Sequence, residues 1–131
     1  MIHAQDLTKS YGKKTVVNKV NLQVNKGSIY GLLGSNGAGK TTILKMISGI
    51  LKENKGTILI DDQSIFENTK KKQQLIFIPD QPYFFSHYTV KQMAEFYRDF
   101  YPNWNEARFN QLQAIFKMDL KSKIHQFSKG M

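Results

Sequence analysis

The sequence predicts an α/β fold followed by a helical region. Short segments with the alternating or continuous apolar pattern of strands occupy much of the chain up to about residue 80. A glycine-rich stretch, GSNGAGKT at 34–41, separates an apolar segment from an amphipathic one. From about Thr89 onward the apolar residues follow helical spacing instead. These three observations predict mixed α and β structure first and helices afterwards.

Composition limits the possible classes of protein. The chain has 131 residues, which fits one domain, and 40% of them are hydrophobic. It has no cysteine, which excludes disulfides and thiolate metal sites. No apolar run approaches the roughly 20 residues that span a bilayer, and MIHAQDLTKS lacks a signal peptide's apolar stretch. We therefore expect a soluble, intracellular chain.

The charge is strongly basic, with a formal net charge of +9. A basic surface can attract nucleic acid, anionic lipid or phosphate. The lysines are scattered apart from 70–72, and no nucleic-acid-binding motif accompanies them. We expect a solvated surface and no nucleic-acid partner.

The predicted elements before the glycine-rich stretch are strands. MIHAQDL and VVNKVNLQV alternate apolar and polar residues around a turn in SYGKK, and NKG at 25–27 forms a second turn. SIYGLL at 28–33 has the continuous apolar pattern of a buried strand. A helix is expected over 40–51, with one apolar face made of Ile43, Met46, Ile47, Ile50 and Leu51.

Two more strands and two helices are predicted after that helix. The strands are TILIDD at 57–62 and QLIFIP at 74–79. Thr89 begins a Thr-x-x-Gln capping box, so a helix is expected from Val90 until Pro102. Asn105 is the expected cap of a second helix, whose predicted buried face consists of Phe109, Leu112, Ile115 and Phe116.

The glycine-rich stretch satisfies the phosphate-loop pattern G-x-x-x-x-G-K-[ST] in full. Glycines let the backbone curl so that several N–H groups face a phosphate, and the following helix adds its positive dipole end. Lys40 would place a cation on the phosphates, and the Thr41 hydroxyl would bind Mg²⁺. A turn without a ligand is the alternative, but the flanking strand and helix favour nucleotide binding. The predicted binding residues are Gly34, Ser35, Asn36, Gly37, Ala38, Gly39, Lys40, Thr41 and Thr42.

The stretch GSNGAGKTT resembles the phosphate loop of ABC-type ATPases, and the resemblance covers essentially the whole chain. It implies that Tyr11, which matches an aromatic residue of the family's N-terminal β-subdomain, stacks on adenine. The alternative is a tyrosine that only packs in a turn.

At two downstream positions the sequence resembles the family but differs from its usual residues. The family usually has Gln after a proline like Pro79, where it helps to hold Mg²⁺; here Asp80 stands there, followed by Gln81. Asp80 is therefore a candidate Mg²⁺ ligand, or else an exposed loop acid. FSKGM at 127–131 resembles the signature motif, which implies that Ser128 and Gly130 contact the ATP of a partner subunit. A frayed tail is the alternative.

The resemblance implies an incomplete ABC-type nucleotide-binding domain of the P-loop NTPase fold over 1–131. Residues 1–88 would form an antiparallel β-subdomain and the phosphate-loop core, and 89–131 a helical subdomain up to the signature. The family's Walker B aspartate, catalytic glutamate and switch histidine follow its signature. We therefore expect these 131 residues alone to bind nucleotide without hydrolysing it. Asp61 and Asp62 are expected to form a turn after an outer strand.

The function that the resemblance implies is that of the ATP-binding subunit of a membrane exporter, with ATP and Mg²⁺ as cofactors. Its expected partners are a transmembrane permease subunit and a second ATPase subunit in a head-to-tail dimer. The expected location is the cytoplasmic face of the membrane. The alternatives are a soluble ABC protein acting on ribosomes or DNA, another phosphate-loop protein, and a non-catalytic nucleotide-binding remnant. A GTPase is disfavoured because NKVN, NKGS and NKGT lack its Asp.

Overall fold

The computed structural model describes residues 1–81 and 83–128. It divides into two compact units, Met1–Phe77 and Ile78–Met131. Each unit is treated by itself below. No helix among the described residues is both long enough and apolar enough to cross a membrane.

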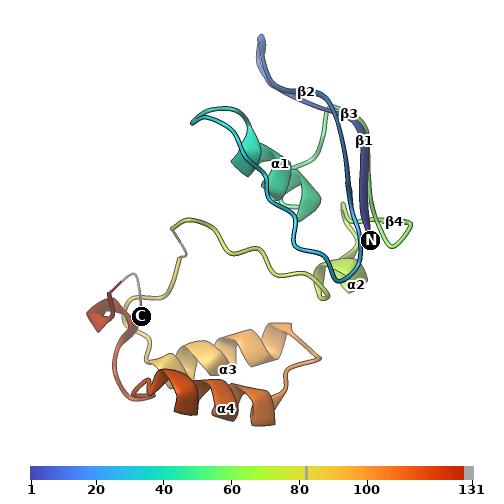
Figure 1. Ribbon diagram of the computed structural model, residues 1–131. Helices are drawn as coiled ribbons and strands as arrows, with labels where there is room; N and C mark the ends of the chain where they lie inside the picture. Colours follow the sequence, from blue (N-terminus) through green and yellow to red (C-terminus); the bar gives the residue numbers. More distant parts are fainter. Residues whose placement is uncertain (82, 129–131) are drawn as a thin grey trace. The chain divides into compact units, whose positions relative to one another are not determined.

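The first unit is built on a four-stranded antiparallel sheet with the strand order β2-β1-β3-β4. Strands β1 (Ile2–Tyr11) and β2 (Lys14–Val24) form a long hairpin, as the alternating pattern predicts. Strand β3 (Lys55–Ile60) pairs with the other edge of β1, and the short β4 (Gln63–Ser64) completes the sheet. Figure 1 shows this sheet beside helix α1 (Lys40–Ile47). The predicted N-terminal antiparallel β-structure is confirmed.

A shift in strand register explains which residues of β1 are buried. Ala4 and Leu7 are both fully buried, although strict alternation would put them on opposite faces of the strand. The pairing of β1 with β2 shifts between these two residues, and Asp6 there has φ 48°. The irregularity turns both side chains toward the core. Helix α1 contributes Ile43 and Met46 to the same core.

The ends of two elements in this unit follow local rules. Asp61 and Asp62 have φ 47° and 60° and form the turn between β3 and β4, which confirms the predicted turn. Helix α1 ends at Ile47, earlier than predicted. Gly49, with φ 67°, and Ile50 donate to the carbonyls of Met46 and Lys45, which is a Schellman cap. The helix stops because this glycine adopts the left-handed conformation.

Two predicted strands are not formed in the structure. Residues 28–33 and 74–79 include no strand, and no described segment pairs with them. Four of their side chains are strongly exposed: Ile29, Leu33, Ile76 and Ile78. A strand depends on a neighbouring ladder for its hydrogen bonds, so an apolar pattern alone does not produce one. The short helix α2 (Thr69–Lys72) precedes the second of these segments.

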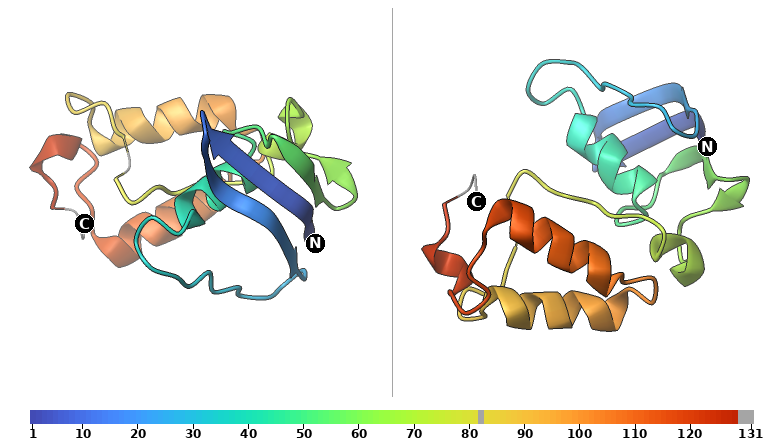
Figure 2. Two further views of the ribbon diagram at one scale, coloured as in Figure 1. Left: turned by 90° about the horizontal axis from the view of Figure 1, so that it is seen from above. Right: turned by 60° about the horizontal axis from the view of Figure 1, so that its bottom comes forward.

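The second unit contains two antiparallel helices, α3 (Val90–Phe100) and α4 (Glu106–Phe116), followed by a 3₁₀ turn, η1 (Ile124–Gln126). Figures 1 and 2 show the two helices side by side. The predicted capping box is present: the Thr89 side chain accepts from the Gln92 N–H, and the Gln92 side chain accepts from the Thr89 N–H. Asn105 caps α4 by accepting from the Arg108 N–H. Both predicted helix starts are therefore confirmed.

The prediction that one face of α4 is buried is wrong. Leu112, Ile115 and Phe116 are exposed, and only Phe109 of the four predicted residues is partly buried. Helical spacing identifies an apolar face but not what covers it. In the described part of this unit, contact with α3 buries little of that face.

Candidate functional site: a phosphate loop beside an aromatic hairpin

The phosphate loop lies in the first unit and leads directly into α1. Residues 34–39 form an irregular turn in which the Ala38 N–H donates to the Ser35 carbonyl at 3.2 Å. The loop residues 34–38 are exposed. The loop therefore presents its backbone to solvent, as binding a phosphate through N–H groups would require.

Gly39 is the position where the loop meets the sheet. It is buried and has φ 88°, and a Cβ there would lie 2.7 Å from the carbonyl oxygen of Val16 and 3.2 Å from the Val17 Cγ2. Any side chain would force the loop away from β2, so only glycine fits both the conformation and the close approach. The second glycine of the pattern thus seats the loop against the sheet.

The start of α1 has the features of an anion site. Its N-terminal cap, Gly39, offers no side chain, so no side-chain cap bonds the first-turn amides. The first helical bond runs from the Ile43 N–H to the Gly39 carbonyl at 2.9 Å. The amide groups of 40–42 precede that bond, and the positive end of the helix dipole lies there.

Lys40 reaches back over the loop. Its Nζ donates to the carbonyl oxygens of Gly34 at 2.6 Å and Ser35 at 2.7 Å. The ammonium is therefore held at the start of the loop by two of its carbonyl oxygens. The next residue, Thr41, is exposed.

Tyr11 belongs to the hairpin against which this loop packs. It ends β1 and pairs with Lys14, while Ser10 pairs with Thr15. Because Gly39 abuts Val16, and successive strand residues are roughly 3.3 Å apart, Tyr11 is only a few residues from the loop. Tyr11 is 53% exposed. Tyr11 and the phosphate loop thus both belong to the first unit, and that Tyr11 shares a nucleotide with the loop stays a prediction.

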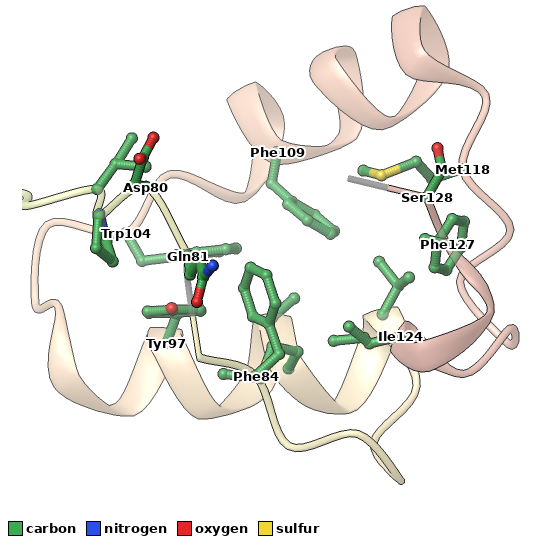
Figure 3. Close-up of a pocket in the computed structure, with 15 residues that line it drawn as sticks. Asp80, Gln81, Phe84, Tyr97, Trp104, Phe109, Met118, Ile124, Phe127 and Ser128 are labelled. Atoms are coloured by element: carbon green, nitrogen blue, oxygen red, sulfur yellow. The ribbon is translucent and has the colours of Figure 1, made fainter. Parts of the chain in front are cut away.

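The other predicted site residues belong to the second unit. Asp80 and Ser128 are exposed residues that line one cavity of about 710 Å³. Figure 3 shows them at opposite ends of it, with Phe84 and Phe109 between and Trp104 at the same end as Asp80. Gly130, the other predicted signature residue, lies outside the described residues. Thr41 belongs to the first unit, so a shared Mg²⁺ site with Asp80 stays a prediction.

The remaining acids and histidines form no evident second centre. Among residues 1–81 and 83–128, no three His, Asp or Glu side chains gather as metal ligands would. The pKa of Asp61 is lowered, chiefly because its carboxylate accepts a hydrogen bond from the N-terminal amine and is attracted by that charge. This contact ties the turn after β3 to the start of β1, which is a structural role.

Sequence reasoning missed Lys9. Its side chain lies over the Tyr11 ring, with Nζ 5.7 Å from the ring centroid. The only signal in the sequence is the spacing of two residues, which can put side chains on one face of a strand. It also missed that aromatic residues from 97–109 line a cavity together with Asp80 and Ser128.

Comparison with known proteins identifies the family. The family model described as ABC transporter matches residues 17–131. "ABC transporter ATP-binding protein YtrB" of Bacillus subtilis is 37% identical over 131 residues, which is 100% of this chain and 45% of that protein. "Linearmycin resistance ATP-binding protein LnrL" of the same species is 34% identical over 137 residues, covering 100% of this chain and 44% of that protein. The chain thus spans less than half the length of these curated relatives.

A solved structure described as the ATP binding subunit of an ABC transporter has the same fold. It matches with a TM-score of 0.87 and 28% identity over 99% of this chain and 57% of that one. The predicted fold class, a P-loop NTPase of the ABC type with an antiparallel β-subdomain and helices, is confirmed. The family match over 17–131, together with the similarity to YtrB over the whole of this chain, shows that this chain belongs to the ABC transporter family, among its ATP-binding proteins.

Proposed function

We propose that the first unit binds the triphosphate of ATP in the phosphate loop and stacks the adenine on Tyr11. The observation that carries this proposal is the loop geometry. Gly39 seats the loop against β2, Lys40 spans it, and the amides at the start of α1 have no side-chain cap. Tyr11 belongs to the same hairpin whose residue Val16 abuts Gly39, which supports this proposal. Gly34, Ser35, Asn36, Gly37, Ala38, Thr41 and Thr42 would supply the remaining contacts.

Magnesium fits the same site. Thr41 offers an exposed hydroxyl one residue after the lysine that spans the loop, and hard cations prefer oxygen ligands. When bound, Mg²⁺ would neutralise phosphate charge. Asp80 is a second candidate ligand, which we retain as part of the proposal because it is exposed and follows Pro79 directly.

The wider function that we propose is the ATP-binding subunit of an ABC exporter. It would work with a transmembrane permease subunit and a second ATPase subunit, at the cytoplasmic face of the membrane. One relative is named a linearmycin resistance ATP-binding protein, and the solved structure is described as the ATP binding subunit of an ABC transporter. Both names support this proposal. Ser128 and Gly130 would contact the ATP held by the second subunit. Helices α3 and α4 would form the helical subdomain that ends in this signature.

We further propose that the 131 residues by themselves bind nucleotide without hydrolysing it. A phosphate cradle supplies positioning and charge neutralisation, whereas hydrolysis also requires an oriented water. The phosphate loop would fulfil the first two requirements through its backbone and through Lys40, which spans it. Phosphate release at a rate above buffer, abolished in Lys40→Ala, would refute this part of the proposal.

Equilibrium binding tests the nucleotide site. We expect the chain to bind MgATP, and Lys40→Ala to weaken that affinity at least about tenfold, since a contact with a charged group contributes roughly 1.5–3 kcal/mol. Lys45→Ala is the matched control, because Lys45 lies on the same helix but in its last turn. Equal losses in the two variants would show that general charge, not the loop, attracts the nucleotide.

A further inference from the structure

The Lys9 side chain makes two contacts at the hairpin. Its Nζ donates to the carbonyl oxygen of Lys52 at 2.6 Å and lies 5.7 Å from the centroid of the Tyr11 ring. That distance is within the range in which an ammonium is attracted to an aromatic face. Lys9 itself is half-buried, whereas Tyr11 is 53% exposed. One face of the ring therefore has a cation against it.

The acceptor of this lysine belongs to a fixed segment. The Asn54 N–H donates to the Thr8 carbonyl at 2.9 Å, and the Asn54 side chain accepts from the Ser10 N–H at 2.7 Å. These two bonds, on either side of Lys9, fasten β1 to the segment that follows α1. The Lys9 ammonium thus bonds to the carbonyl of a segment that is itself hydrogen-bonded to β1 on either side of Lys9.

We propose that Lys9 is a positioning residue for nucleotide binding, holding one face of the Tyr11 ring so that the other face is presented to the base. This inference rests on the proposed function, in which Tyr11 stacks on adenine. It adds a residue outside the phosphate loop that acts only through Tyr11.

The physical reason is conformational entropy. An exposed tyrosine at the end of a strand must be ordered when a base stacks on it, and ordering a side chain reduces the affinity. A cation already on one face restricts the ring before the base arrives. It also leaves a single face for stacking. The effect should therefore appear with ligands that carry a base and be absent with a bare triphosphate.

Two other roles for Lys9 make different predictions. If the ammonium only attracted the negative phosphates, its loss would weaken ATP and inorganic tripolyphosphate alike. If it only stabilised the fold, its loss would lower the unfolding midpoint and would again affect both ligands. The ratio of the two affinities separates positioning from both alternatives.

The experiment compares the dissociation constants of ATP and tripolyphosphate, both with Mg²⁺, for the full chain and three variants. We expect Lys9→Met, which keeps a long apolar stem, to weaken ATP binding about two- to fivefold, the scale of an exposed cation–π contact. Tripolyphosphate affinity should stay unchanged. Lys9→Arg should restore the ratio, because a guanidinium also binds aromatic faces and carbonyls. Lys13→Met, which removes a charge from the turn of the same hairpin, should leave the ratio as it is.

A double variant completes the test. In a Tyr11→Ala background, Lys9→Met should cause no further loss of ATP affinity, because Lys9 acts through the ring. An unchanged ATP affinity in Lys9→Met, an equal loss for both ligands, or the same loss without Tyr11 would each overturn the inference while leaving the nucleotide site standing. Failure of the unmodified chain to bind either ligand would instead refute the proposed function and the inference with it.

Discussion

Removing the Thr41 hydroxyl tests whether this side chain binds Mg²⁺ in the nucleotide site. It is exposed at the start of α1, one residue after the lysine that spans the loop. Thr41→Val keeps the shape and removes the oxygen. We expect the affinity for MgATP to fall about tenfold or more, as for loss of one contact to a charged group. Affinity for ATP in excess EDTA should be unchanged. If Mg²⁺ strengthened ATP binding to the variant as much as to the original chain, Thr41 would not be a metal ligand.

Asp119 makes the second unit's stability depend on pH. The Lys121 N–H and the Ser122 hydroxyl donate to its carboxylate, at 3.0 and 2.7 Å, and lower the pKa of Asp119 below its ordinary value of 3.8. The folded state is therefore more stable when the Asp119 carboxylate is ionised. This stabilisation is present at neutral pH and is lost as the pH falls below 3.8 and through the lower pKa of the folded state.

Asp119→Asn should therefore lower the urea midpoint at pH 7 and make little difference at a pH below the folded-state pKa of Asp119, where the carboxylate is protonated in both states. The fluorescence of Trp104, the single tryptophan, reports unfolding of this unit. An equal loss at both pH values would show that packing, not charge, makes Asp119 stabilising.

The N-terminus of helix α3 is stabilised by a capping box. Thr89 and Gln92 satisfy each other's backbone N–H groups, at 3.2 and 2.9 Å, and so cap the helix. Thr89→Ala should destabilise the second unit by about 1 kcal/mol, as loss of an N-cap generally does. Urea unfolding followed by Trp104 fluorescence measures this change. Thr89→Ser is the control and should retain most of the stability; equal loss in both would mean that the Thr methyl group, not the cap, matters.

Features set by a few neighbouring residues could be predicted from the sequence. The caps at Thr89 and Asn105 depend on three or four positions, and the turn at 61–62 on two acids after an apolar run. The phosphate loop is equally local, since its pattern spans eight positions. The contact of Gly39 with Val16 was not predicted, but it explains why the pattern requires that glycine.

Features that depend on distant partners could not be predicted in the same way. The apolar runs at 28–33 and 74–79 have strand-like patterns, yet pairing needs a ladder that no nearby residue reveals. Likewise, the spacing of Leu112, Ile115 and Phe116 identifies a face of α4, but its burial depends on what packs there. Lys9 was overlooked because its acceptor, the Lys52 carbonyl, lies 43 residues away.

At the scale of the molecule, the exposed apolar runs should make the 131-residue chain self-associate. Ile76 and Ile78 are 72% and 80% exposed, and Ile29 and Leu33 are exposed more still. Unpaired backbone next to exposed apolar side chains is a template for pairing with another chain. Light scattering after size exclusion should show a mass that rises with protein concentration.

Substitution of the run at 74–79 tests that cause. Ile76→Lys with Ile78→Lys should reduce the association, because charged residues block strand pairing at edges. The matched control is Leu112→Lys with Ile115→Lys, which removes exposed apolar side chains from helix α4 instead. A monomer at every concentration, or an equal effect of the two pairs, would contradict the explanation.

Amide hydrogen exchange on adding MgATP tests the central claim most directly, because it reports which backbone groups the nucleotide contacts. If the phosphate loop is the site, peptides covering 34–42 should gain the strongest protection, and a peptide containing Tyr11 a weaker one. Lys40→Ala should abolish both at the same nucleotide concentration. Protection confined to other segments, or unaffected by Lys40→Ala, would contradict the account.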